Sequence, residues 1–363
     1  MAGPRHPLRL GIIGCGRVVE EYHLRALLAV DQIQVVALSD NNASRLDRAA
    51  QRLDGCRRYP DYRAMLEDGA VDIVAVCAPP EFHREMGLAV LDAGKHLFME
   101  KPIALNLDDA DRLVERASLA KTKSMVGFNW RRHRLIREAQ QMIAGNELGS
   151  IVAAHTVFSS ANEPQAGSAD WRHREDLGGQ VLFDLAIHHF DLWEVLIPAG
   201  IEEVFARRGA DRTGEWVTVS AAMSNGALIT SLFSHGVSNV NEMQISGTQG
   251  RISFSCYRPD SLRIHRGSAP TGAMRSWIEG TSAALSSAPR IVANMFMGGD
   301  VIGSFRDEWH DLAEAIRGDS IVEGDLRAGR RALQVALAAE RSFSTNCSEK
   351  IDSPPGAGGR DAR

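Results

Sequence analysis

The chain has 363 residues, of which 44% are apolar and 24% charged, and its formal net charge is −5. This length allows a large core and exceeds the usual size of one domain, so we expect two. A slightly acidic protein without a basic block lacks the electrostatic footprint of nucleic-acid binding. The five cysteines are scattered without any C-x-x-C spacing, which argues against a disulfide framework or zinc site and fits a reducing cytoplasm. We also expect no signal peptide and no membrane span, because no long apolar run occurs.

The first 130 residues alternate strand and helix patterns. Short runs rich in Val and Ile predict strands at 8–13, 33–38, 71–77, 96–99 and 124–128. Helical patterns lie between them, at about 17–30, 42–53, 81–94 and 106–120. Apolar strands separated by helices predict a parallel sheet covered on both faces, so residues 1–130 are expected to form a doubly wound Rossmann domain of α/β class.

The rhythm changes at about residue 150. Strand patterns at 150–160, 215–224, 227–235, 241–247 and 251–257 follow one another with turn signals, and one helix at 178–195 is inserted early. Two helices, at about 304–317 and 326–343, close the chain. We therefore expect residues 131–347 to form a second α/β domain with an open, mostly antiparallel sheet. Residues 267–302 are expected to form an irregular excursion, and residues 348–363 a disordered tail.

The segment GIIGCGRV joins the first strand directly to a helix. Gly14 suits a tight turn, and Gly16 lets a pyrophosphate approach the helix N-terminus. Asp40 follows the second strand, where a carboxylate accepts hydrogen bonds from ribose hydroxyls and repels a 2′-phosphate. This arrangement favours NAD, although Arg17 and Arg45 leave NADP open. The alternative is a helix-capping glycine beside a surface aspartate.

The third strand ends in CAPPEFH and the fourth in MEKP, at the sheet edge where ligands of such folds bind. Pro79 and Pro80 stop the third strand and lead into a helix with His83 near its start. Lys101 follows the fourth strand directly, so it is placed to act in the site. The alternative is a solvated loop lysine paired with Glu100.

The helix at 178–195 carries a narrow polar stripe on an otherwise apolar sequence. Asp184, His188 and Asp191 are spaced by four and then three residues, which puts them on one helix face. His188 suits a base that takes a hydroxyl proton, because the unperturbed histidine pKa is about 6.5. Asp184 can orient that ring or bind a substrate hydroxyl, and Lys101 can stabilise the developing alkoxide. His189 points about 100° away, so we expect it to pack or form hydrogen bonds.

Two alternatives for the stripe stay open. Its side chains, with His189, have the spacing of metal ligands on one helix face, although a nearby lysine disfavours a cation. The stripe can also be structural, with its polar groups bonded to neighbouring backbone.

Two arginine-rich segments, NWRRHR and DWRHRED, each contain a tryptophan. Arginine suits carboxylate or phosphate, and a flat indole can cover a sugar ring. These arginines favour, weakly, a substrate with an anionic group, unless they are solvated or paired with nearby acids.

The segments GIIGCGRV, CAPPEFH, AGKHLFMEKP, GFNWRRH and DWRHREDLGGQVLFDLAIHHFDL occur in the order found in the Gfo/Idh/MocA family. That is the family of glucose–fructose oxidoreductase and inositol dehydrogenase, and the resemblance extends to RDEWHDLAEAIRGD near the end. Val19 departs from the third small position of the glycine motif. The resemblance implies an NAD(P)-dependent oxidoreductase acting on a sugar, cyclitol or related polyol, as a homodimer or homotetramer. It places the family's lysine at Lys101, with a cis peptide before Pro102, and the family's Asp-x-x-x-His pair at Asp184 and His188.

The expected site residues follow from these motifs and from the resemblance. Cofactor contacts are expected from Gly14, Gly16, Arg17, Val18, Asp40, Ala78, Pro79, Pro80, His83, Glu100, Lys101 and Asn129. Substrate contacts are expected from Lys101, Arg131, Trp171, Arg172, Asp184 and His188, of which Lys101, Asp184 and His188 are expected to be catalytic, with no metal. Two other functions are a nucleotide-sugar ketoreductase, in whose compared versions a tyrosine replaces His188, and a non-catalytic NAD(P)-binding sensor.

Overall fold

A computed structural model describes residues 6–161, 181–211, 214–258, 262–266 and 299–352. Among them the chain forms two compact units, the first from residues up to 133 and from 299–333, and the second from the rest. The expectations for Trp171, Arg172, the tail from 353 on and most of the 267–302 excursion lie outside the described residues.

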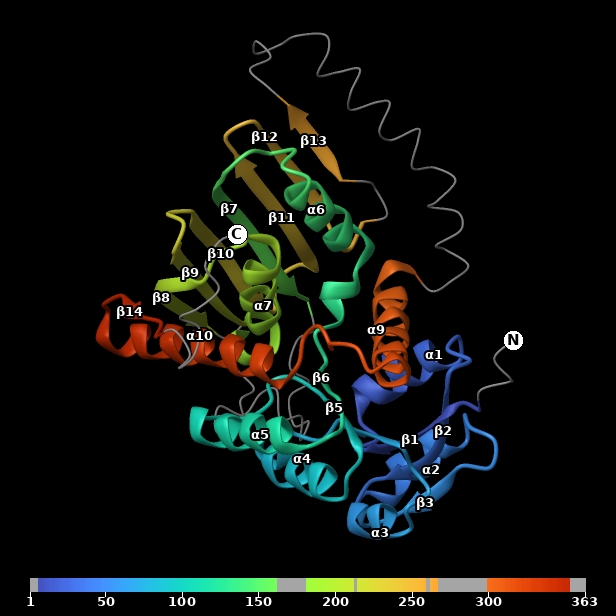
Figure 1. Cartoon of the computed structure of the whole chain (residues 1–363). Helices are drawn as coiled ribbons and strands as arrows, with labels where there is room; N and C mark the ends of the chain where they lie inside the picture. Colours follow the sequence, from blue (N-terminus) through green and yellow to red (C-terminus); the bar gives the residue numbers. More distant parts are fainter. Residues whose placement is uncertain (1–5, 162–180, 212–213, 259–261, 267–298, 353–363) are drawn as a thin grey trace. The chain divides into compact units, whose positions relative to one another are not determined.

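The first unit is built on a six-stranded parallel sheet with the order β3-β2-β1-β4-β5-β6 (Figure 1). The strands are β1 (Leu8–Ile13), β2 (Ile33–Ser39), β3 (Arg57–Tyr59), β4 (Ile73–Val76), β5 (His96–Met99) and β6 (Ser124–Val126). The strand order reverses between β1 and β4, which is where such sheets bind ligands. The predicted doubly wound fold is confirmed, with β3 as an additional short edge strand.

Helices cover this sheet, and three of them begin at a residue whose side chain caps the first turn. They are α1 (Leu24–Leu27), which continues a π-helical turn (Val19–His23), α2 (Ala43–Ala50), α3 (Tyr62–Glu67), α4 (His83–Asp92), α5 (Leu107–Leu119) and α9 (Gly299–Gly318). The Asn42 side chain accepts a hydrogen bond from the backbone of Arg45, and Asn106 does the same for Asp109, which satisfies open N–H groups in both first turns. Helix α9 comes from the far end of the sequence and packs against α1.

The second unit contains an eight-stranded sheet with the order β13-β12-β11-β7-β10-β9-β8-β14. The strands are β7 (Ile151–Ser160), β8 (Ile201–Asp211), β9 (Gly214–Met223), β10 (Leu228–His235), β11 (Val240–Gly247), β12 (Gly250–Ser255), β13 (Arg263–Arg266) and β14 (Glu349–Lys350). Among these strands the neighbours pair antiparallel except β7 and β10, which pair parallel. The predicted mostly antiparallel sheet is confirmed, and the parallel pair at its centre is an addition to it.

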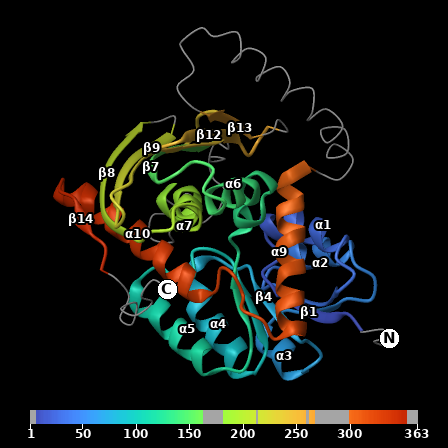
Figure 2. The ribbon, with the colours of Figure 1, turned by 45° about the horizontal axis from the view of Figure 1, so that its top comes forward.

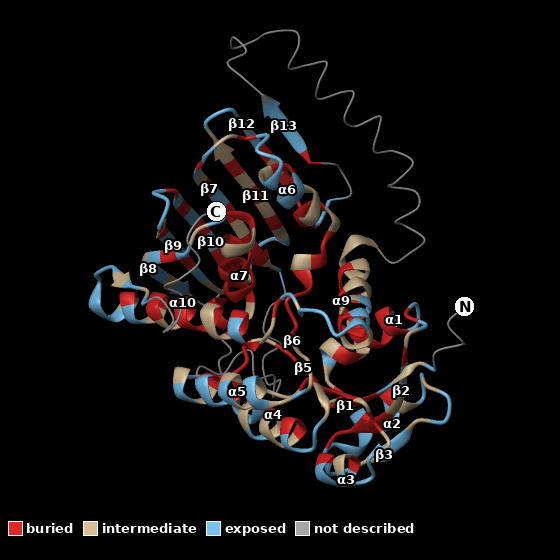
Figure 3. Ribbon diagram, in the orientation of Figure 1, coloured by how far each residue is buried: buried red, intermediate tan, exposed pale blue. Residues whose placement is uncertain are grey.

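Helices α6 (Arg134–Ala144) and α7 (Ile187–Leu196) belong to the second unit, and the sheet curves around α7 (Figure 2). The helix α10 (Leu326–Thr345) begins in the first unit and ends in the second. Helix α7 is almost wholly buried (Figure 3), as its apolar sequence predicts. It is preceded by a π-helical turn, Leu182–Ala186, which the sequence pattern did not indicate. No helix in the described ranges is long and apolar enough to cross a membrane.

Candidate active site

The glycine turn after β1 has the geometry that a dinucleotide requires. Gly14 has a φ of +89°, and a Cβ there would lie 2.6 Å from the backbone oxygen of Cys77, so only glycine fits. A Cβ on Gly16 would meet nothing within 4 Å, which leaves its backbone open to a ligand. The turn then leads into the helical segment that carries Val19. These features fit the pyrophosphate of a dinucleotide at a helix start.

Asp40 lies at the end of β2 and is joined to this turn. One carboxylate oxygen accepts a hydrogen bond from the Cys15 backbone at 2.8 Å, and the other accepts one from the Asn42 backbone at 2.8 Å. Each oxygen keeps a further lone pair, so the carboxylate can still accept hydrogen bonds from ribose hydroxyls. Arg17 forms an ion pair with Glu21 at 2.9 Å on the half-exposed surface of its helix.

His83 ties the turn after β4 to the turn after β5. Its ring is fully buried, with Nδ1 2.7 Å from the Pro102 backbone oxygen and Nε2 2.8 Å from that of Ala78. Burial lowers the pKa of His83, and the two carbonyls act against this shift. Both ring nitrogens face backbone carbonyls, which only accept, so the neutral ring donates its one hydrogen to one of these turns and packs against the other.

Glu100 and Lys101 follow β5, and the Lys101–Pro102 peptide is cis, as the resemblance implied. One oxygen of Glu100 lies 2.8 Å from Nε2 of His23, and the other accepts a hydrogen bond from the Lys101 backbone at 3.2 Å. The Glu100 carboxylate is therefore held by a histidine that the sequence analysis did not single out. His23 was detectable as a polar residue on the apolar face of its helix.

The segment after β6 contains Asn129 and the first arginine cluster. The Asn129 side chain donates a hydrogen bond to the Ser304 hydroxyl at 2.9 Å, and the Arg131 guanidinium lies 5.9 Å from the centre of the Phe128 ring. Arg132 is buried and bonds to Asp311 at 3.2 Å and to the Glu323 backbone at 2.8 Å. Arg132 therefore serves the packing of α9.

In the second unit, Asp184 lies on the π-helical turn and His188 on the first turn of α7. Oδ2 of Asp184 is 3.3 Å from Nε2 of His235, the last residue of β10. His188 is mostly buried, and its ring lies 6.2 Å from that of Phe158. The structure thus adds a second histidine, His235, beside the predicted Asp-x-x-x-His pair. In the sequence, the one signal for His235 is its position at the end of a predicted strand.

His189 is fully buried among polar groups of the neighbouring strands. Nδ1 lies 3.0 Å from the Thr156 hydroxyl and Nε2 3.1 Å from the side-chain oxygen of Asn241. Burial lowers the pKa of His189 to about 4. The expectation that His189 packs or forms hydrogen bonds is confirmed.

Other buried groups near β1 and α9 titrate outside the usual range. Burial raises the pKa of the Cys15 thiol to about 12, and it raises the pKa of the Glu308 carboxyl well above its usual value. Cys15 is therefore a packed thiol without nucleophilic character. In the described part of the chain, no group of three or more His, Cys, Asp or Glu side chains could hold a metal ion.

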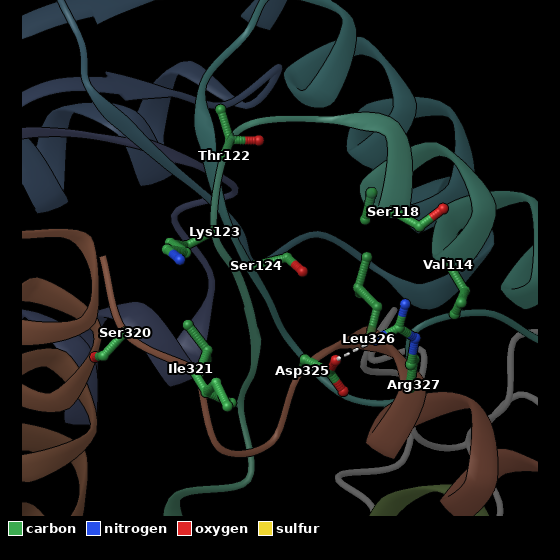
Figure 4. Close-up of a pocket in the computed structure, with 12 residues that line it drawn as sticks. Val114, Ser118, Thr122, Lys123, Ser124, Ser320, Ile321, Asp325, Leu326 and Arg327 are labelled. Carbon is green, nitrogen blue, oxygen red and sulfur yellow. Dashed lines mark ion pairs between the residues drawn. The ribbon is translucent and has the colours of Figure 1, made fainter. Parts of the chain in front are cut away.

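A pocket of about 160 Å³ lies between α5, β6 and the start of α10 (Figure 4). Ser118, Lys123, Ser124 and Asp325 are among the residues that line it, and none of the predicted site residues does. It is therefore separate from the candidate site.

Comparisons with known proteins assign the chain to a protein family. Residues 8–128 match a family model described as "Oxidoreductase family, NAD-binding Rossmann fold", and residues 136–253 match the "GFO/IDH/MocA C-terminal domain". The fold and the glycine turn thus define an NAD-binding oxidoreductase. The chain belongs to the Gfo/Idh/MocA family.

Relatives with assigned activities include dehydrogenases and a dTDP-3,4-didehydro-2,6-dideoxy-alpha-D-glucose 3-reductase of Saccharopolyspora spinosa. Myo-inositol 2-dehydrogenase of Thermotoga maritima is 32% identical over 199 residues, which cover 55% of this chain and 58% of that protein. The match therefore spans less than two thirds of that relative's length. D-glucoside 3-dehydrogenase of Escherichia coli is 26% identical over 63% of this chain and 68% of its own.

Solved structures share the whole fold. The WlbA dehydrogenase from Bordetella pertussis, in complex with NADH and UDP-GlcNAcA, has a TM-score of 0.79 and 21% identity, over 96% of this chain and 99% of its own. Myo-inositol 2-dehydrogenase from Lactobacillus plantarum has a TM-score of 0.78 and 21% identity, over 95% of this chain and 100% of its own.

Proposed function

We propose that the protein moves a hydride between NAD and a hydroxyl-bearing carbon of a sugar, cyclitol or related polyol. The observation that carries this proposal is the buried helical segment with Asp184 on its π-helical turn and His188 on α7, in a chain whose other unit has Lys101 just after β5. The names of the dehydrogenase relatives support the substrate class. NAD, when bound, supplies the hydride chemistry itself.

The three polar side chains would divide the proton chemistry. His188 takes the hydroxyl proton during oxidation and returns it during reduction. Lys101 supplies a positive charge that stabilises the developing alkoxide. Asp184, which His235 orients, accepts a hydrogen bond from a substrate hydroxyl. Arg131, Trp171 and Arg172 are proposed to bind the rest of the substrate.

NAD is favoured over NADP because the carboxylate of Asp40 lies beside the glycine turn. The proposed cofactor contacts remain those expected from the sequence, with His83 acting through the turns that it holds.

A second candidate is reduction of a nucleotide-linked sugar. The WlbA structure with UDP-GlcNAcA favours it, since the same fold accommodates such a ligand in that protein. Turnover measured with nucleotide-linked sugars and with free polyols distinguishes the two candidate functions.

We further propose that the protein is a homodimer or homotetramer in the cytoplasm. One face of the second-unit sheet exposes Trp216, Leu228 and Leu232 on neighbouring strands, and a second copy of the chain would cover them. The cysteines of the described residues form no disulfide with one another, which supports a reducing compartment.

The test is nicotinamide absorbance with NAD and NADP separately, across polyols, sugars, sugar acids and nucleotide-linked sugars. With the substrate found, His188→Ala should lose about a hundred-fold or more in kcat and bind NADH normally. The exposed His310 on α9 provides a matched control, His310→Ala, with unchanged turnover. Full activity of His188→Ala would refute the role of His188, and absence of turnover with every substrate class would favour a sensor.

A further inference from the structure

A chain of hydrogen bonds inside the first unit ends at the backbone of Lys101. Nε1 of Trp309, on α9, lies 3.1 Å from Nδ1 of His23. Nε2 of His23 lies 2.8 Å from one oxygen of Glu100, and the other oxygen accepts the Lys101 backbone N–H at 3.2 Å. The chain thus joins α9, the helix after the glycine turn and the segment after β5.

The direction of these bonds follows from the chemistry of indole. An indole N–H can only donate, so Nδ1 of His23 must accept and carries no hydrogen. Nε2 therefore carries the single ring hydrogen and donates it to Glu100. A second proton on Nδ1 would face the indole hydrogen, so the geometry selects one neutral tautomer.

Aromatic side chains enclose the His23 ring and exclude water from it. Phe98, Phe305 and Trp309 each meet the ring nearly edge-on, with centroid distances of 5.3, 5.1 and 5.6 Å. Phe98 and Trp309 stack on each other at 4.3 Å. The exposed fraction of His23 is 0%. In such surroundings hydrogen bonds are strong, and an unpaired polar group would be costly.

Glu100 is also confined by its neighbours. A Cβ on Gly127 would lie 2.9 Å from the Glu100 carboxylate, so the carboxylate rests against the backbone that follows β6. Its two oxygens are therefore fixed in different directions, one by His23 and one by Lys101.

We propose that His23, locked as the Nε2–H tautomer by Trp309, is a positioning residue that orients Glu100 and thereby the backbone of Lys101. Because Lys101 has a catalytic role only under the function proposed above, the effect on turnover rests on that function. The tautomer of His23 does not depend on the proposed function. A displaced lysine costs rate because the charge must lie close to the developing alkoxide.

Two substitutions at position 23 separate hydrogen bonding from packing. His23→Gln keeps an acceptor for the indole and a donor for Glu100, whereas His23→Leu removes both. With the substrate identified by the panel, His23→Leu should lose about ten- to a hundred-fold in kcat with a nearly unchanged KM for NAD, and His23→Gln should recover most of it. Equal activity of the two variants would overturn the proposal.

The second measurement needs no substrate. In ¹⁵N NMR of the full chain with labelled histidine, the ring signals that disappear in His23→Gln belong to His23. They should show a hydrogen-free Nδ1 and a protonated Nε2. In Trp309→Phe, which keeps an aromatic ring beside Phe98, the same ring should no longer be limited to this tautomer.

The NMR and turnover measurements distinguish a failure of the tautomer inference from a failure of the proposed role of Lys101. A hydrogen on Nδ1 in the unmodified protein would overturn the inference whatever the activity. The expected tautomer combined with full turnover of Lys101→Ala would instead refute the proposed role of the lysine.

Discussion

Asp184 and His235 form a carboxylate–imidazole pair, with Oδ2 3.3 Å from Nε2, between the π-helical turn and the end of β10. The two residues are far apart in the sequence, and both side chains are mostly buried. This contact with His235 fixes the orientation of the Asp184 carboxylate.

We expect His235→Phe to weaken substrate binding through Asp184. Loss of a hydrogen bond to a charged group costs about 1.5–3 kcal/mol, so kcat/KM for the polyol should fall about ten- to a hundred-fold. NADH binding, followed by fluorescence, should be unchanged. The control is His155→Phe on β7, whose ring is exposed and bonds to Thr230. An equal loss in both variants would rule out a specific role of His235.

We expect Asp40→Ala to weaken NADH binding about ten-fold or more, because it removes the acceptor for the ribose and also frees the Cys15 backbone N–H. Fluorescence titration measures the affinity. Asp47→Ala is the control, since Asp47 is exposed on α2 and pairs with Arg58. Unchanged affinity of Asp40→Ala would remove Asp40 from the cofactor site.

Acidification should destabilise the second unit through His189. Its pKa is about 4 in the folded protein and about 6.5 in the unfolded chain, so the unfolded state binds more protons between these values. Stability therefore falls as the pH drops from 6.5 toward 4, by up to about 1.4 kcal/mol per pH unit. Denaturant unfolding should show a shallower acid dependence in His189→Gln than in the unmodified protein. A matching slope in both would contradict this prediction.

Glu308 should destabilise the first unit as the pH rises. Burial raises the pKa of its carboxyl well above the usual value, so the folded protein keeps a proton that the unfolded chain loses above about pH 4.5. The melting temperature of Glu308→Gln relative to the unmodified protein should therefore increase from pH 5 to pH 8. Glu314→Gln, at an exposed position on the same helix, is the control. A large loss of stability in Glu308→Gln at pH 8 would instead indicate an ionised carboxylate paired with Arg132.

The open face of the second-unit sheet should determine the oligomeric state. Leu228→Lys with Leu232→Lys places two charges on that face and should give a monomer in sedimentation velocity. Leu119→Lys, at an exposed apolar position in the first unit, is the control. A dimer or tetramer unaffected by the paired substitutions would mean that another surface holds the subunits together.

Much of the first unit was predictable because its strands are continuous apolar runs. The run at 96–99 coincides with β5, and the doubly wound parallel sheet followed from the alternation with helices. Strand β3 was not predictable, since its three residues, Arg57, Arg58 and Tyr59, have no apolar pattern. Strand β8 was missed because the adjacent charges Glu202–Glu203 and Arg207–Arg208 break the alternation of apolar and polar residues that marks a strand.

The candidate site was predictable only where spacing or strand ends indicated it. Asp184 and His188 stand out on an apolar helix, and Lys101 stands out after an apolar strand. His235 and Trp309 did not, because their partners, Asp184 and His23, are brought to them by tertiary packing. A single sequence does not contain those pairings in any local pattern.

The position of α9 also has a consequence for how the chain folds as it is synthesised. Phe305, Trp309 and Leu312 are part of the same apolar core as Leu10, Ile12 and Phe98. A ribosome releases the strands of the parallel sheet before these three side chains are synthesised, so the nascent first unit has an uncovered apolar face until α9 has emerged. A fragment that ends at residue 133 should therefore aggregate or recruit chaperones, whereas adding α9 as a separate peptide should restore a compact fold.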